Sequence, residues 1–375
     1  MNTPELRERC ATELLAGAAR VRAMSAFVGL DGFVDEILHV VDKRESAEIF
    51  HRLPTIAKLS ARLAGAAGQS TNIELVNQRT KLGGNGPIMA NALATFGLHV
   101  SYLGTLGYPA LHPVFEPFAQ RAEVHSIAEP GYTDALEFED GKIMLGKHYP
   151  LKQVTWENIQ ARFGREKFAA KLQGADLVGF VNWVMLPYLS DVWESLLREL
   201  CPALKGPRRK MFFDLCDPEK RTQKDILRAL DLITRFENYF DVLLGLNEKE
   251  AAEIGQALGL DTSDHSPDGL SRLALEINRR LPVHTLVVHP VSYALAASGG
   301  KVSIVQGPFI ASPLITTGAG DHFNSGFCLG KLLGLDDALC VLTGVATSGH
   351  YVRTALSPTM DDLAAMLRQW PARAD

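Results

Sequence analysis

The sequence predicts an α/β protein built on a doubly wound, mostly parallel sheet with helices on both faces and a small β lid. Short apolar runs alternate with segments of helical periodicity along most of the chain. The apolar runs are interleaved with amphipathic helical segments, which points to a largely parallel sheet covered on both faces. Hydrophobic residues make up 46% of the 375 residues and charged residues 22%, an ordinary globular balance. We therefore expect one α/β domain over residues 1–375, since large α/β domains reach this length.

Six apolar runs are the expected strands, at 24–30, 100–107, 175–184, 210–215, 239–246 and 284–290. Amphipathic segments at 88–97, 189–200 and 248–259 are expected helices between them. In sheets of this class, ligands bind beyond the carboxyl ends of the strands. Polar loops that directly follow the six runs are therefore the places to look for a site.

Residues 131–150 interrupt this alternation. Asp140-Gly141 lies between two β-prone arms, which is a strong hairpin signal. A hairpin inserted into an α/β chain is either a decoration at the edge of the sheet or part of a lid over the active site. We expect the lid.

Charge and cysteine content exclude several classes of protein. The net charge is −5 and the pI is about 6.1, which does not favour nucleic-acid binding. Five cysteines without a CxxC pair suggest neither a disulfide framework nor a zinc site. The N-terminal segment lacks the apolar core of a signal peptide, and no run approaches the ~18 apolar residues that span a bilayer. We expect a cytoplasmic protein with neither nucleic acid nor membrane as partner.

Asp31 and Asp35 follow the first expected strand. Each is either a solvated turn or helix cap, or a carboxylate that accepts hydrogen bonds from substrate hydroxyls. Further on, a glycine-rich loop containing Asn85 precedes a helix and lets the backbone approach a ligand closely; its glycines are Gly83, Gly84 and Gly86. A dinucleotide fingerprint fails here because Met89 replaces its third glycine, and no GxxxxGK[ST] loop occurs anywhere.

Asn247 and Glu250 follow the expected strand at 239–246. Asn followed three residues later by Glu is a capping box at the start of a helix. The functional alternative is a site that orders Mg²⁺ through water, because Mg²⁺ keeps most of its waters when a carboxylate and phosphates hold it.

The most informative motif is Thr317-Gly318-Ala319-Gly320-Asp321. Two glycines before a helix let successive N–H groups converge on an anion, and the helix dipole favours negative charge there. Asp321 is not needed for anion binding, so it is either an ordinary first-turn carboxylate or a base that removes a proton from a hydroxyl.

Together these motifs resemble the ribokinase-like (PfkB) carbohydrate kinase family, in the same order along the chain from about residue 24 to about 367. The resemblance implies the ribokinase-like fold and transfer of the γ-phosphoryl group of ATP, with Mg²⁺, to a hydroxyl of a sugar, polyol or nucleoside. It implies that Asp321 is the catalytic base and that the backbone of 318–320 is an anion hole. It also implies a homodimer formed through the lid.

The resemblance assigns binding roles to the remaining motif residues. It places Thr317, Asn247 and Glu250 at the nucleotide, with Glu250 reaching the metal through water. It places five residues at the substrate, namely Asp31, Asp35, Gly83, Gly84 and Asn85.

Two other functions stay open at this point. Pro290 and Tyr293 stand where relatives carry glycines near the nucleotide, which motivates a ligand-binding or regulatory relative without catalysis. An ADP-dependent sugar kinase shares the GxGD pattern and is the other alternative.

Overall fold

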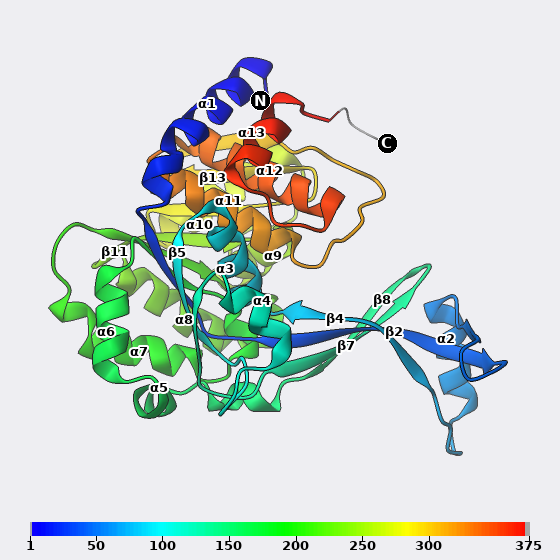
Figure 1. Ribbon diagram of the computed structural model, residues 1–375. Helices are drawn as coiled ribbons and strands as arrows, with labels where there is room; N and C mark the ends of the chain where they lie inside the picture. Colours follow the sequence, from blue (N-terminus) through cyan, green and yellow to red (C-terminus); the bar gives the residue numbers. More distant parts are fainter. Residues whose placement is uncertain (1, 372–375) are drawn as a thin grey trace.

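The computed structural model describes residues 2–371 and has a nine-stranded central sheet (Figure 1). From one edge to the other its strands are β14 (Lys301–Gln306), β13 (Tyr293–Ser298), β12 (Thr285–Val288), β11 (Phe240–Leu246), β10 (Arg209–Asp214), β9 (Leu177–Phe180), β1 (Ser25–Gly29), β5 (His99–Gly104) and β6 (Glu123–Ser126). All neighbours from β12 to β6 are parallel, and β13 and β14 are antiparallel additions. The doubly wound, mostly parallel sheet is confirmed.

Each of the six predicted apolar runs overlaps one of these strands, in chain order β1, β5, β9, β10, β11 and β12, and β5 and β10 begin one residue before their runs. These strands are buried on both faces, as β9 shows with four buried residues out of four. Adjacent Phe212 and Phe213 of β10 point to opposite faces, and each joins a different hydrophobic core. One hydrophobic core therefore lies on each face of the sheet, as the apolar runs predict.

Helices cover both faces (Figure 1). One face carries α1 (Pro4–Val21), α3 (Asn85–Phe96), α4 (Glu116–Ala119), α11 (Ala319–Leu333), α12 (Asp337–Thr354) and α13 (Met360–Arg368). The other carries α5 (Trp156–Arg162), α6 (Arg165–Gly174), α7 (Leu189–Glu199), α8 (Gln223–Phe236), α9 (Glu248–Ala257) and α10 (Pro267–Arg280). The three predicted helices correspond to α3, α7 and α9.

A second, smaller sheet projects from the body of the molecule (Figure 1). It consists of β2 (Phe33–Arg44), β3 (Phe50–Arg52), β4 (Leu75–Gly83), β7 (Gly131–Phe138) and β8 (Gly141–Lys147), with α2 (Ile56–Gly65) at its outer end. Residues 131–150 contain the antiparallel pair β7 and β8. The long strand β2 pairs with β4 and β7 and carries the chain from the central sheet into this one.

Within residues 2–371, no helix combines the length and the apolar character needed to cross a membrane.

Candidate active site

The Gly318–Asp321 turn opens α11 near the carboxyl ends of the central strands. Gly318 is the N-cap residue with φ +93°, a left-handed conformation that favours glycine. A Cβ there would also lie 3.2 Å from the Tyr351 hydroxyl and 3.3 Å from Ile88. Asp321, in the first helical turn, is only 8% exposed. The turn therefore presents a helix N-terminus and a buried carboxyl group at one point.

Two cavities meet at this turn. The lid cavity, of about 370 Å³, is lined by Asp35, Thr317, Gly318 and Asp321 together with residues of the smaller sheet. The loop cavity, of about 330 Å³, lies between the 307–316 loop, α11 and α12, and Ala319 and Gly320 line it. Its walls are mostly apolar side chains, including Pro290, Pro308, Phe309, Phe323, Val345 and Val352. Residues of the 316–321 segment thus line both cavities.

The environment of Asp321 favours its protonated form. Burial raises the pKa of this carboxyl well above the usual aspartate range, and the charges of Asp214 and Asp31 raise it further. A hydrogen bond from Asn85 lowers the pKa in part. A carboxylate held in such a place accepts a proton readily, which is the property of a general base.

Asp35 lines the lid cavity from β2 and is 4% exposed. The Lys81 ammonium lies 4.0 Å from its carboxylate. A Cβ on Gly83 would lie 2.4 Å from the Asp35 carboxylate, so only glycine fits opposite it. Asp35 was expected directly after a strand, and this was wrong: it lies inside β2, because the chain runs on as a strand into the smaller sheet.

Asp31 is fully buried and does not line the lid cavity. Its carboxylate accepts hydrogen bonds from the backbone N–H groups of Asn85 at 3.0 Å and Gly86 at 2.9 Å. It also accepts from the Asn182 amide at 2.7 Å. Burial raises its pKa to about 6, although these hydrogen bonds oppose the shift. The expectation that Asp31 binds substrate hydroxyls is corrected: the carboxylate caps the N-terminus of α3, while Gly84 and Asn85 of the capped loop line the cavity.

Asn247 and Glu250 form the capping box of α9. The Asn247 side chain accepts from the Glu250 N–H at 2.9 Å, and Glu250 Oε2 accepts from the Asn247 N–H at 2.8 Å. Glu250 Oε1 accepts from the Asp217 N–H at 3.0 Å. Asn247 lines the loop cavity, whereas both oxygens of Glu250 already have backbone partners. Among the described residues there is no group of three His, Cys, Asp or Glu side chains that could hold a metal ion directly.

Lys142 and Asp214 lie at the site but were not among the predicted site residues. Lys142 of β8 donates to Thr317 Oγ1 at 3.2 Å and so joins the smaller sheet to the turn. Asp214 ends β10 and accepts from Asn324 at 2.9 Å, yet among residues 2–371 its Oδ1 and the Asn324 Oδ1 are buried without a hydrogen-bond partner. Burial raises the pKa of Asp214 well above its usual range, as does the charge of Glu250. Its position at the end of the 210–215 run was the one available clue.

The chain is similar to known sugar kinases along most of its length. Residues 2–370 match the family described as prokaryotic ketohexokinase. A ketohexokinase of Haloferax volcanii is 30% identical over 348 residues, which cover 92% of this chain and 91% of the relative.

Solved structures share the fold at lower identity. A carbohydrate kinase from Agrobacterium tumefaciens has a TM-score of 0.62 and 18% identity, and the match covers 92% of this chain and 97% of that one. A ribokinase from Cryptococcus neoformans var. grubii serotype A in complex with ADP has a TM-score of 0.60 and 17% identity, with 92% and 98% covered. The predicted resemblance to ribokinase-like (PfkB) carbohydrate kinases is thus confirmed, and the chain belongs to the prokaryotic ketohexokinase family.

Proposed function

We propose that this protein, a sugar kinase that uses ATP, phosphorylates a hydroxyl of a ketohexose in the lid cavity, with Asp321 as the general base. The observation that carries the proposal is the place of Asp321: it is a buried carboxyl that lines the lid cavity beside Asp35, in the turn whose Ala319 and Gly320 also line the loop cavity. The family match and the name of the Haloferax relative support a ketohexose as the acceptor.

Each cavity suits one reactant. In the lid cavity, the Asp35 carboxylate accepts hydrogen bonds from sugar hydroxyls and Gly84 lets the sugar approach the backbone, while Gly83 leaves room for the Asp35 carboxylate itself. In the loop cavity, apolar walls suit the adenine ring and Asn247 supplies a polar contact. The γ-phosphorus then lies near the turn, facing the sugar hydroxyl.

Asp321 removes the proton of the attacking hydroxyl as the new P–O bond forms and the bond to the ADP oxygen breaks. The transition state spreads negative charge over three phosphoryl oxygens. Backbone N–H groups of the 318–320 turn and the dipole of α11 stabilise that charge. Thr317 directly precedes these N–H groups, and Lys142, which donates to the Thr317 hydroxyl, adds positive charge there.

The residues present fit a hydrated Mg²⁺ ion. The partnerless Asp214 Oδ1 is a buried acceptor beside Glu250, and such an oxygen suits a water of a hydrated cation. We place the ion where Asp214 and Glu250 hold it through water, which is compatible with the two backbone bonds of Glu250. When bound, Mg²⁺ neutralises phosphate charge.

An acceptor screen tests the proposed function. Purified protein with Mg-ATP and D-fructose should release ADP and form a phosphorylated sugar, and D-glucose, D-ribose and adenosine should react more slowly. Replacing ATP with ADP distinguishes an ADP-dependent kinase. Failure of every acceptor, with nucleotide binding intact, would favour a non-catalytic relative.

We also propose a homodimer formed through the smaller sheet. β8 is an edge strand, and its Met144 and Leu145 side chains are 46% and 48% exposed. A second copy that packs on this edge would cover both. Sedimentation should show a dimer that Leu145→Lys dissociates, and a monomeric wild-type protein would contradict the proposal.

A further inference from the structure

Two consecutive carbonyl groups of the 317–321 turn are held by side chains from outside the predicted motif residues. The Tyr351 hydroxyl of α12 donates to the Thr317 carbonyl oxygen at 3.0 Å. The ring of His322 hydrogen-bonds through Nδ1 to the Gly318 carbonyl oxygen at 2.8 Å. The two rings stack with centroids 3.6 Å apart and planes 12° from parallel. Both rings are buried, so this stacked pair holds the turn from one side.

Holding a carbonyl oxygen also aims the N–H group of the same peptide unit. In a trans peptide the oxygen and the amide hydrogen point in opposite directions within one plane. The Tyr351 bond therefore sets the direction of the Gly318 N–H, and the His322 bond sets that of the Ala319 N–H, which donates to Thr316 O at 3.1 Å. Gly318 has no Cβ and is intrinsically free to rotate, and the two side-chain contacts add to the backbone bond that the His322 N–H donates to the Gly318 carbonyl at 3.1 Å.

The hydrogen bonds around His322 form a chain that runs in one direction. A carbonyl oxygen only accepts, so Nδ1 of His322 carries the proton. Burial lowers the pKa of His322 to about 4, so the ring is neutral near pH 7 and Nε2 is an acceptor. Ser357 Oγ, 2.9 Å away, then donates to Nε2. Ser357 accepts from the Asn91 amide at 3.3 Å, and Asn91 Oδ1 accepts from Arg121 at 3.1 Å.

From these contacts we infer that Tyr351 and His322 are positioning residues of the anion hole. Tyr351 aims the Gly318 N–H at the transferred phosphoryl group, and His322 fixes the next peptide, whose N–H is held by Thr316. Ser357 secures the required tautomer of His322, and the exposed Arg121 polarises the chain from its far end. The inference rests on the proposed function, because it assigns the turn to phosphate binding. It adds two residues that never touch the substrate.

Steady-state kinetics with D-fructose and Mg-ATP provide the first test. Tyr351→Phe keeps the stacked ring and removes one hydroxyl, so kcat should fall about ten-fold while the KM for sugar stays within about two-fold. His322→Asn keeps a donor near the Nδ1 position and should retain more activity than His322→Ala. Tyr188→Phe is the matched control, because its ring is 43% exposed and its hydroxyl has no hydrogen bond within residues 2–371.

Nucleotide binding provides a second test that does not depend on turnover. Calorimetry compares AMP with AMPPNP, an ATP analogue that carries the additional phosphates. Tyr351→Phe and Ser357→Ala should weaken AMPPNP binding and leave AMP binding unchanged, with a melting temperature close to that of the wild type. If wild-type protein binds both nucleotides differently but phosphorylates nothing, the proposed function fails and this inference survives.

Three outcomes would overturn the inference. If the Tyr351→Phe and His322→Ala variants both keep kcat within two-fold of the wild-type value, the turn does not need the hydrogen bonds of these two side chains. If kcat decreases across the variants only as far as the melting temperature decreases, Tyr351 and His322 have a structural role only. If the wild-type protein binds AMP and AMPPNP with equal affinity, the turn does not contact the additional phosphates.

Discussion

Asp321 combines three properties that a single residue needs for proton abstraction. It is buried, it faces the lid cavity, and it lies in the first turn of a helix whose N-terminus favours negative charge. Burial and the neighbouring Asp214 and Asp31 raise its pKa. Hydrogen bonding from Asn85 keeps the carboxyl oriented.

Asp321→Asn should lower kcat by roughly 10² to 10⁴, because the variant cannot accept the proton of the attacking hydroxyl. The wild-type rate should fall as the pH decreases through the raised pKa of Asp321, so the acid limb lies above the usual aspartate range of about 3.9. Kinetics from pH 5 to 9 measure both effects. Asp231→Asn is the control, since its side chain is 69% exposed on α8. Full activity of Asp321→Asn would exclude the base.

Two elements carry the loops that meet at Asp321. Helix α3 begins at the glycine-rich loop, and Asp31 caps it through the N–H groups of Asn85 and Gly86. A Cβ on Gly86 would lie 2.5 Å from Asp31 Oδ1, so the close contact requires glycine. Strand β8 reaches the turn from the other side through Lys142.

Asp31→Ala should lower the free energy of unfolding by about 3 kcal/mol. The change leaves buried backbone N–H groups and the Asn182 amide without their acceptor, and each such group costs about 1–3 kcal/mol. Urea denaturation measures the loss. Asp268→Ala, at an exposed position in the first turn of α10, should cost less than about 1 kcal/mol. Equal losses in the two variants would contradict the buried cap.

Lys142→Met should lower kcat/KM about five-fold, because it removes the bond between the smaller sheet and Thr317 and withdraws a positive charge from the phosphoryl site. Initial rates with limiting sugar measure the effect. Lys58→Met on α2 removes an exposed lysine from the outer end of the same sheet and should have no effect. If both variants behave like wild type, β8 does not act as a lid.

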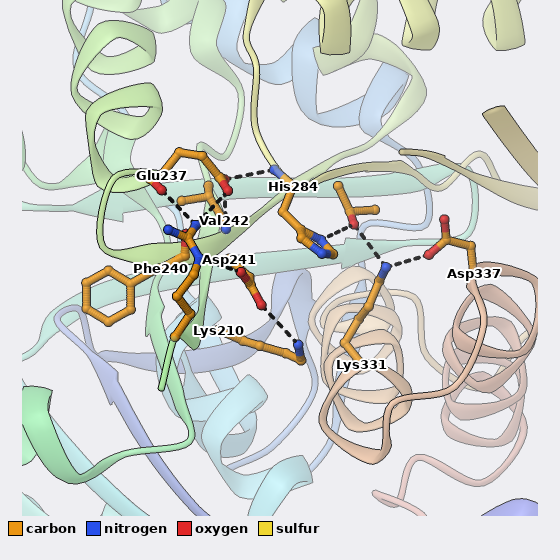
Figure 2. Close-up of polar contacts among 10 residues, drawn as sticks. Lys210, Glu237, Phe240, Asp241, Val242, His284, Lys331 and Asp337 are labelled. Carbon is orange, nitrogen blue, oxygen red and sulfur yellow. Dashed lines mark hydrogen bonds and ion pairs between the residues drawn. The ribbon is translucent and has the colours of Figure 1, made fainter. Parts of the chain in front are cut away.

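At the scale of the whole molecule, a polar network joins three elements near the amino-terminal ends of β11 and β12 (Figure 2). Lys331 at the end of α11 donates to Asp337 at 2.5 Å and to Thr285 at 2.9 Å. The His284 ring lies 2.9 Å from the same Thr285 hydroxyl, and the His284 N–H donates to Glu237 at 2.8 Å. One end of α11 is therefore anchored here, and its other end opens at Gly318.

Lys331→Met should lower the free energy of unfolding by about 3 kcal/mol, since removing one partner of a buried ion pair leaves the other uncompensated. The Lys331 side chain is 6% exposed and that of Asp337 is 20% exposed. Chemical denaturation measures the loss, and Lys331→Met with Asp337→Leu should recover part of it. Lys224→Met, at an exposed position of α8, is the control. A cost below about 1 kcal/mol would show that water compensates the pair.

The sequence by itself determined the parallel sheet and the Gly318–Asp321 turn, because local patterns predict both. Apolar runs between amphipathic segments predict the sheet, and two glycines before a helix predict the turn. It assigned both Asp31 and Asp35 to the substrate. Only the tertiary structure separated them, since Asp31 meets the start of α3, far along the chain, whereas Asp35 enters a strand that lines the cavity. Lys142 and Tyr351 reach Thr317 from 175 and 34 residues away, and such contacts depend on packing that no local pattern encodes.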